Sequence, residues 1–372
     1  QPVPPRSRPM RARGSSSTAS SPTALKVHLK PATPEPKPVR FKDASEWERD
    51  TIILPLQSLR KFDIPTKLLG WSVQGESLLV LFACLYWAFD QYKCYAGIWL
   101  VPVSEVANGL IKWVTQRPRP LWEDERVQAR GWSSEYSFPS SHSQLAMALA
   151  TFFVLGSAHE QAVTSTSAMV AFPLALCVGL SRIHAGLHYP SDVAVGWFLG
   201  GLTAAAYCAA LPTLLSISAA LPFGSRAAAL CVPTLLTAAA LVATFRAVRA
   251  THAPLADAWR RNACRGKYAK RVLDPLNVPF GSYMGMVGVL AGLSTGESLM
   301  HRFPLPYPAS AAHAALRCVV GNIGLLVCFE GIAALTPKRP LALYSALRFV
   351  KYAIVPVYIL ELAPWAFAHF GI

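Results

Sequence analysis

Residues 174–205, LALCVGLSRIHAGLHYPSDVAVGWFLGGLTAA, determine the fold that this sequence predicts. A polar segment with Arg182 and His188 lies between two apolar runs, residues 162–181 and 190–215. Each run is near the ~20 residues that a helix needs to cross a bilayer. The sequence therefore predicts two membrane helices whose facing ends carry charged and titratable side chains.

Two further polar segments lie upstream, between the predicted spans 95–115 and 143–158. Together the three segments contain Lys112, Arg119 and Pro120; Pro139, Ser140, Ser141 and His142; and Ser181, Arg182, His188 and Asp192. Because two predicted spans separate the upstream segments from the last one, all three reach the same membrane face. We therefore expect one shared site.

The cations and serines of these segments suit a phosphate ester. A phosphoryl group in its transition state spreads negative charge over three equatorial oxygens, so a site without metal needs several fixed donors. Lys112, Arg119 and Arg182 supply positive charge, and guanidinium groups can bind two oxygens at once. Ser140 and Ser141 can add hydroxyl and backbone N–H donors at the start of a helix, where an anion is favoured.

The two histidines and the aspartate suit nucleophilic and acid catalysis. One imidazole can attack phosphorus while the other protonates the leaving alkoxide, because imidazole titrates near neutral pH. Asp192 lies four residues after His188, and Pro190 favours a first helical turn between them. The carboxylate can then fix the tautomer of His188. We predict His188 as the nucleophile and His142 as the acid.

The three segments resemble the signatures of the type-2 phosphatidic acid phosphatase superfamily. The resemblance implies a phosphatase that uses neither metal nor another cofactor and works through a phosphohistidine, with the roles given above. The middle signature usually has glycine where this chain has Ser141. Residues 134–142, SEYSFPSSH, are most similar to the sphingosine-1-phosphate phosphatase branch, and dolichyl-diphosphate phosphatases also carry a hydroxyl residue at that position.

Three other polar residues near the segments have more than one interpretation. Glu135 and Tyr136 precede His142 and are either solvated loop residues or contacts to a substrate headgroup. His184 corresponds to no superfamily signature position, so we predict a loop or packing role for it.

Composition places the chain in a membrane. Of 372 residues, 53% are hydrophobic and 15% are charged, against about 25% charged in a typical soluble domain. The formal net charge of +15 could suit nucleic acid, but Lys and Arg lie in the N-terminal region, the motif segments and short connections. We therefore expect the bilayer as a partner and no nucleic acid, and the sequence leaves the oligomeric state open.

We predict an all-α, polytopic protein with a six-helix phosphatase core and additional C-terminal transmembrane helices. The predicted segments are a disordered basic tail at 1–50, which could be a transit peptide, an interfacial segment at 51–69, the core at 70–248, a basic connecting loop at 249–280 and C-terminal helices at 281–372. Nine spans are expected, at about 71–90, 95–115, 143–158, 162–181, 190–215, 227–248, 281–300, 312–335 and 345–370.

The basic segments and the resemblance predict opposite orientations. Four predicted spans separate the loop 123–130 from the basic segment 260–271, so both lie on the catalytic face. The positive-inside rule makes that face cytosolic, or stromal in a plastid. The resemblance implies a luminal or external catalytic face, most simply in the endoplasmic reticulum.

The predicted reaction is hydrolysis of a lipid phosphate monoester, most simply a sphingoid base 1-phosphate. A lipid substrate is favoured because extraction from the membrane would lose ~0.8 kcal/mol of burial per methylene. Polyprenyl diphosphate and phosphatidic acid would use the same residues. A lipid phosphotransferase and a lipid-binding protein without activity are the alternatives of other classes.

Overall fold

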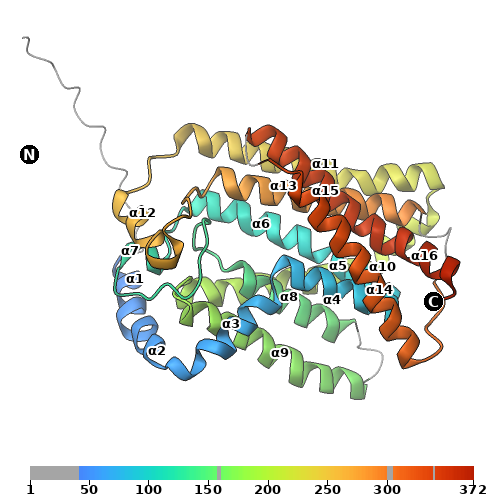
Figure 1. The fold of residues 1–372 in the computed structure, drawn as a ribbon, viewed down its shortest axis with the longest axis horizontal. Coiled ribbons are helices and arrows are strands. Elements are labelled where there is room, and N and C mark those ends of the chain that lie inside the picture. Colours follow the sequence, from blue (N-terminus) through green and yellow to red (C-terminus); the bar gives the residue numbers. More distant parts are fainter. Residues whose placement is uncertain (1–41, 157–160, 300–304, 338–339) are drawn as a thin grey trace, which may run out of the picture. The chain divides into compact units, whose positions relative to one another are not determined.

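The computed structural model describes residues 42–156, 161–299, 305–337 and 340–372. Within these ranges the chain is helical and contains no strand. Figure 1 shows the long helices lying side by side, with α1, α7 and α12 gathered near one end of them. The predicted all-α fold is confirmed.

The helices before the first motif form the N-terminal part of the bundle. They are α1 (Lys42–Glu48), a π-helical turn (Arg49–Ile53), α2 (Leu54–Ser58), a 3-10 turn (Arg60–Phe62), α3 (Asp63–Ser72), α4 (Gly75–Ala88) and α5 (Gln91–Ile98). The helices that carry or join the motifs are α6 (Leu100–Thr115), α7 (Pro120–Glu123), α8 (Ser141–Leu155), α9 (Gln161–His184), α10 (Pro190–Ala220) and α11 (Phe223–Thr251).

The C-terminal part follows a short connecting segment. Its elements are α12 (Asp257–Ala263), a 3-10 turn (Gly266–Tyr268), α13 (Asn277–Leu299), α14 (Ala311–Ala334), α15 (Leu341–Val357), a π-helical turn (Tyr358–Leu362) and α16 (Ala363–Phe370).

The predicted tail at 1–50 requires a correction at its end. Residues 1–41 lie outside the described residues, but residues 42–50 form α1 and the start of the π-helical turn. Ser45 and Glu48 of α1 are buried, and both hydrogen bond to Arg117. Composition predicted disorder because the residue that holds this helix lies far away in the sequence.

Among the described residues, seven helical segments are long and apolar enough to cross a membrane, and an eighth is formed if the bent pair α3 and α4 is one span. Nine were expected. The predicted span 71–90 corresponds mainly to α4, which is bent by 62° from the preceding helical segment Arg60–Ser72. The predicted span 143–158 corresponds to α8, whose 15 residues extend only about 22 Å, less than the hydrocarbon thickness of about 30 Å.

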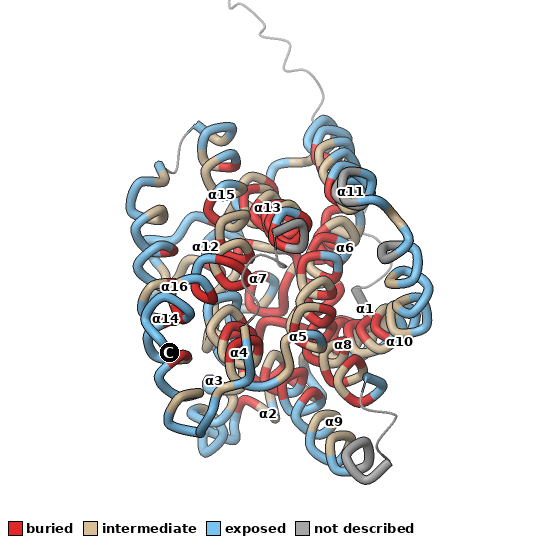
Figure 2. Tube along the Cα trace, turned by 90° about the vertical axis from the view of Figure 1, so that its right-hand side faces the viewer, coloured by how far each residue is buried: buried red, intermediate tan, exposed pale blue. Residues whose placement is uncertain are grey.

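The inner helices are buried and the outer helices expose apolar side chains. Figure 2 shows buried positions concentrated on α6, α8 and α13. Leu145, Ala148 and Phe152 of α8 are buried, so α8 is apolar because other helices surround it. By contrast, Phe198 on α10 and Leu235 on α11 are exposed. Such outward apolar faces are those that lipid chains cover, and the protein is an integral membrane protein.

Glycines allow two helix pairs to approach closely. A Cβ on Gly200 of α10 would overlap the backbone carbonyl of Gln144 in α8. On α13, a Cβ on Gly288 or Gly292 would overlap backbone carbonyls of α15. Small residues at helix contacts are typical of membrane bundles. The first pair positions the middle motif against the last one.

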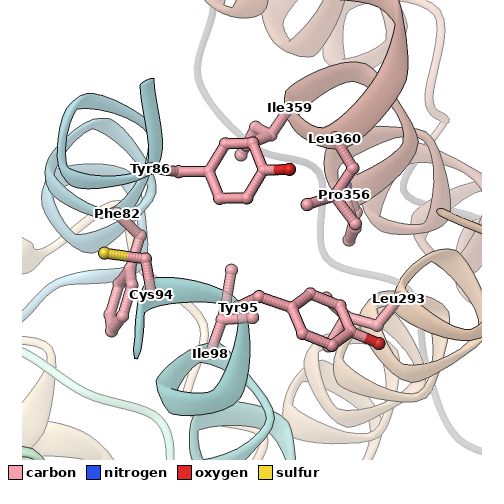
Figure 3. Close-up of a pocket in the computed structure, with 9 residues that line it drawn as sticks. All are labelled: Phe82, Tyr86, Cys94, Tyr95, Ile98, Leu293, Pro356, Ile359 and Leu360. Atoms are coloured by element: carbon pink, nitrogen blue, oxygen red, sulfur yellow. The ribbon is translucent and has the colours of Figure 1, made fainter. Parts of the chain in front are cut away.

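The C-terminal helices also pack against the N-terminal part of the bundle. Figure 3 shows Tyr86 of α4 pointing toward Leu360 near the C-terminus, and Tyr95 of α5 beside Leu293 of α13. The hollow between them has a volume of about 10 Å³, room for about one water molecule. The two parts are therefore in close apolar contact.

Candidate active site

The three motif segments meet where α6 and α9 end and α8 and α10 begin. Leu121 N–H donates to the carbonyl of Gly186 over 3.3 Å, which joins the first segment to the last. Ser140 N–H donates to the carbonyl of Asp192 over 3.0 Å, which joins the middle segment to the last. The predicted shared location of the motifs is therefore present in the structure.

Arg119 is the centre of this junction. The chain leaves α6 through Gln116, which has a left-handed φ of 49°, and Arg119 then precedes the first turn of α7. Its guanidinium donates to the carbonyls of Glu135 (2.6 Å), Leu187 (2.9 Å) and Tyr136 (3.2 Å). Its Nη1 also lies 3.0 Å from Nε2 of His188.

The contact with Arg119 fixes the tautomer of His188. A guanidinium can only donate hydrogen bonds, so Nε2 of the imidazole accepts and the ring proton is on Nδ1. Nδ1 faces Oδ2 of Asp192 at 3.6 Å, which is longer than a hydrogen bond. Burial, and then the positive charges of Arg119 and Lys112, hold the pKa of His188 well below its ordinary value. The free site therefore presents a neutral imidazole with an unprotonated Nε2.

The Asp192 carboxylate lies closer to three other residues than to His188. Oδ1 accepts from Nη1 of Arg117 over 2.6 Å, and Oδ2 accepts from the Ser137 hydroxyl (2.5 Å) and the Tyr189 N–H (2.8 Å). The predicted direct bond between Asp192 and His188 is thus absent, and the two groups lie 3.6 Å apart. Sequence reasoning missed Ser137, although it lies only two residues before Pro139, where the middle motif begins.

Arg117 connects this carboxylate to α1. Nη2 donates to the Ser45 hydroxyl over 2.9 Å and to Glu48 Oε2 over 3.0 Å, while Nη1 also contacts the Ser191 hydroxyl at 2.8 Å. Sequence reasoning missed Arg117 and Glu48. The position of Arg117, two residues before Arg119, was a signal for this arginine, but nothing local indicated Glu48.

The middle motif starts a helix. Ser140 is the N-cap of α8, and its hydroxyl accepts from Ser143 N–H (3.4 Å) and from the Ser143 hydroxyl (2.8 Å). The N–H of Ser140 is donated to the carbonyl of Asp192. With both its hydroxyl and its N–H held in this way, Ser140 orders the start of α8. Ser141 and His142 form the first turn beyond this cap, as predicted for a helix that begins at the motif.

His142 lies among the predicted cations. Burial and then the charge of Arg182 are the main causes that hold the pKa of His142 well below its ordinary value. Among the described residues, Nε2 of His142 and Nε of Arg182 are buried without a hydrogen-bond partner. Arg182 lies in the last turn of α9, where its guanidinium occupies the space that a side chain at Gly70 of α3 would need. Both groups are therefore available to a ligand.

Lys112 is paired with Glu135. Nζ of Lys112 lies 2.6 Å from Oε2 of Glu135, with 1% of the lysine side chain and 25% of the glutamate side chain exposed. Burial raises the pKa of Glu135, but the positive charges of Lys112 and Arg119 together lower it by more. The pKa of Glu135 is therefore below its ordinary value. Glu135 is thus a partly exposed carboxylate beside the predicted phosphate lysine, and the solvated-loop interpretation is wrong for it.

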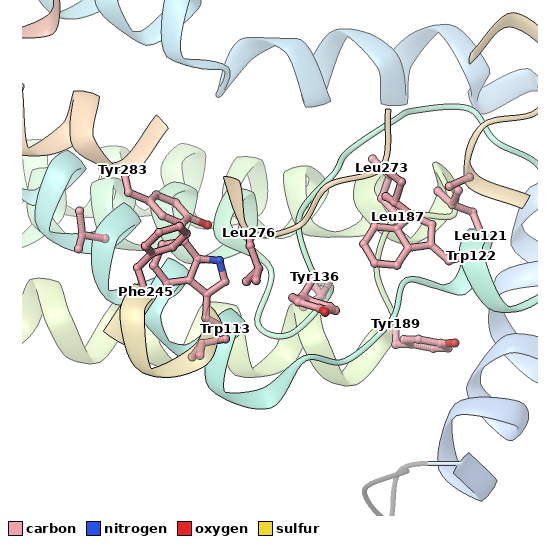
Figure 4. Packing of buried hydrophobic residues seen from close by; sticks show 14 of the residues in the cluster. Trp113, Leu121, Trp122, Tyr136, Leu187, Tyr189, Phe245, Leu273, Leu276 and Tyr283 are labelled. Atoms are coloured by element: carbon pink, nitrogen blue, oxygen red, sulfur yellow. The ribbon is translucent and has the colours of Figure 1, made fainter. Parts of the chain in front are cut away.

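The connecting segment between α11 and α13 covers the loop that joins the first two motifs. Asn262 donates to the carbonyl of Trp122 over 3.0 Å, and Arg265 donates to the carbonyl of Glu125 over 2.7 Å. Figure 4 shows Leu273 and Leu276 of this segment with Trp122 and other buried residues of the loops. These contacts confirm that the loop 123–130 and the basic segment 260–271 lie on the same face.

His184 has a packing role, as predicted. Its Nδ1 lies 3.0 Å from the Thr66 hydroxyl, and its Nε2 lies 2.9 Å from Nη1 of Arg130. The ring is buried and joins α9 to α3 and the motif loop.

Comparisons with protein families agree with this site. Residues 91–216, which include every predicted site residue, match the PAP2 superfamily. Residues 284–372 match the PAP2 superfamily phosphatase, transmembrane extension. No curated protein and no solved structure matched the chain. The chain therefore carries a PAP2 superfamily phosphatase domain with its transmembrane extension, and it is a phosphoric monoester hydrolase.

Proposed function

We propose that the protein hydrolyses a sphingoid base 1-phosphate through a phosphohistidine intermediate on His188. The observation that carries this proposal is the 3.0 Å contact between Arg119 and Nε2 of His188. It leaves Nε2 unprotonated and ready to attack a phosphoryl group that Arg119 also binds. The sphingoid assignment is supported by the resemblance of residues 134–142 to that branch of the superfamily.

The first half of the proposed reaction forms the phosphoenzyme. Arg119, Arg182 and Lys112 bind the three equatorial oxygens, and Nε2 of His188 attacks phosphorus while the bond to the alkoxide breaks. The alkoxide takes its proton from His142. An acid must be protonated, and the negative charge of bound phosphate offsets the cations that lower the pKa of His142 in the free site.

The second half releases phosphate. His142, now neutral, takes a proton from water as the water oxygen bonds to phosphorus and the bond to Nε2 breaks. Nδ1–H of His188 remains directed at Asp192, which the Arg117 and Ser137 contacts hold in place. Asp192 thereby stabilises the positive charge that develops on the imidazole during attack.

A lipid substrate is supported by the surroundings of the site. The motif segments lie at helix ends of an integral membrane protein, where a phosphate headgroup can bind while its chain stays in the bilayer. We propose the endoplasmic reticulum as the membrane concerned, on the resemblance to the sphingosine-1-phosphate phosphatase branch.

The test is release of inorganic phosphate by purified protein in detergent, with excess chelator present. We expect release from sphingosine 1-phosphate to exceed that from phosphatidic acid and polyprenyl diphosphate. Brief incubation with ³²P-labelled substrate should leave base-stable, acid-labile label on the wild type and none on His188→Ala. His369→Ala, which changes an exposed histidine, should keep the label. Label on His188→Ala, or strict dependence on magnesium, would contradict the mechanism.

A further inference from the structure

Glu135 brings a negative charge into a site that otherwise attracts anions. Its carboxylate lies 2.6 Å from Nζ of Lys112, and the lysine is almost fully buried. Apart from Asp192, whose carboxylate is paired with Arg117, the rest of the site presents Arg119, Arg182 and neutral imidazoles. A carboxylate at this position would repel a phosphate bound to the same lysine, so its presence needs an explanation.

Glu135 is also held in place from several sides. Tyr283 of α13 lies beside its carboxylate and interacts with it electrostatically, and the Glu135 carbonyl accepts from Nε of Arg119 over 2.6 Å. The Tyr283 ring packs edge-on against Trp113, with centroids 5.3 Å apart, and fills the space above Gly109. Because both backbone and side chain are fixed, Glu135 cannot easily swing away when a ligand enters.

We propose that Glu135 selects substrates by binding a protonated amine on the carbon next to the phosphate-bearing carbon. This inference rests on the proposed function, because it assumes that Lys112 binds the phosphate. A phosphate oxygen about 2.8 Å from Nζ of Lys112 lies near the carboxylate that is 2.6 Å from the same nitrogen. An ammonium group on the neighbouring carbon fits between the phosphate and the Glu135 carboxylate. It attracts both anions, which would otherwise repel each other.

The inference separates the candidate substrates by their chemistry. A sphingoid base 1-phosphate carries such an amine, which is protonated at neutral pH like other alkyl amines. Phosphatidic acid and polyprenyl diphosphates have no cation next to the phosphate. The 25% exposure of the Glu135 side chain leaves it accessible to a headgroup that arrives at the site.

The test compares sphingosine 1-phosphate with an alkyl phosphate of equal chain length that lacks the amine. For wild-type protein in detergent we expect kcat/KM to be roughly ten- to hundredfold higher for the lipid with the amine. This ratio corresponds to the contribution of one hydrogen bond to a charged group. In Glu135→Gln this ratio should approach one. Glu125→Gln, which changes an exposed carboxylate of the same loop, should keep the wild-type ratio.

Three results would overturn the inference: no amine preference in the wild type, an unchanged ratio in Glu135→Gln, or an equal rise of kcat/KM for both lipids in Glu135→Gln. The last would make Glu135 a counter-ion that competes with phosphate. If Glu135→Gln does not fold, the wild-type preference for the amine over its N-acetylated analogue decides the question.

A binding measurement separates this inference from the proposed function. Calorimetric titration of His188→Ala with the same two lipids measures the amine preference without turnover. Preferential binding of the amine without any phosphate release by the wild type would refute the proposed hydrolysis and support the role of Glu135. Equal binding of both lipids, with normal hydrolysis by the wild type, would refute the role of Glu135 and support the proposed hydrolysis.

Discussion

Replacing Arg117 with methionine should destabilise the fold by about 4 kcal/mol. Arg117 is only 4% exposed and lies between Asp192, which is 0% exposed, and Glu48, which is 7% exposed. Methionine keeps much of the side-chain volume but leaves both carboxylates without their cation. Removing one partner of a buried ion pair costs about 3–5 kcal/mol, because the remaining charge stays buried and uncompensated.

Arg126→Met is the matched control. Arg126 also contacts two carboxylates, Asp50 at 2.9 Å and Asp124 at 2.7 Å, but 57% of its side chain is exposed. Exposed ion pairs contribute about 0–1 kcal/mol. We therefore expect Arg126→Met to change the free energy of unfolding by less than about 1 kcal/mol.

The assay is denaturant-induced unfolding in detergent, followed by tryptophan fluorescence. Adding Glu48→Gln to Arg117→Met should recover part of the loss, because the double variant leaves one buried carboxylate fewer; neighbouring residues that share a network couple in this way. Equal, small losses for Arg117→Met and Arg126→Met would refute the reasoning, and so would a double variant less stable than Arg117→Met.

Two further predictions concern the pH dependence and the helix packing. Burial and nearby cations lower the pKa of His188. We therefore expect kcat/KM for a soluble aryl phosphate to stay constant as the pH falls through about 6.5, the ordinary pKa of histidine. A pH–rate profile, corrected for substrate ionisation, that declines at or above that value would contradict this expectation. Gly200→Ala should lower stability by about 1–3 kcal/mol, because its Cβ overlaps the α8 backbone. Gly331→Ala, which meets nothing within 4 Å on α14, should be neutral or stabilising, and denaturation of both variants gives the comparison.

The sequence predicted the motif end of the bundle well because its information is local. Apolar runs set the helices, and each motif lies at the boundary of such a run. Because α8 leaves the motif end and α9 returns to it, the motifs meet there although α8 is short. Ser140 and Pro190 are ordinary helix-start residues, and both begin helices in the structure.

The incorrect predictions depend on contacts between distant residues. Hydropathy cannot distinguish α8, which other helices surround, from a helix that faces lipid, so a short buried helix was counted as a span. Arg117 and Glu48 lie 69 positions apart, and only the folded chain shows that α1 completes the Asp192 network. The sequence left Glu135 open between a solvated loop residue and a headgroup contact, because only the folded chain brings it to Lys112 and beside Tyr283 of α13.

The contact between Tyr283 and Glu135 gives the transmembrane extension a role in the site. Tyr283 lies on α13, the helix that leads into the matched extension at residue 284. The position of α13 is set by its close packing on α15 through Gly288 and Gly292. Since Tyr283 lies beside the carboxylate that pairs with Lys112, this packing also helps to place that carboxylate. The extension therefore does more than anchor the protein, because its helix packing positions a tyrosine beside a charge at the proposed phosphate site.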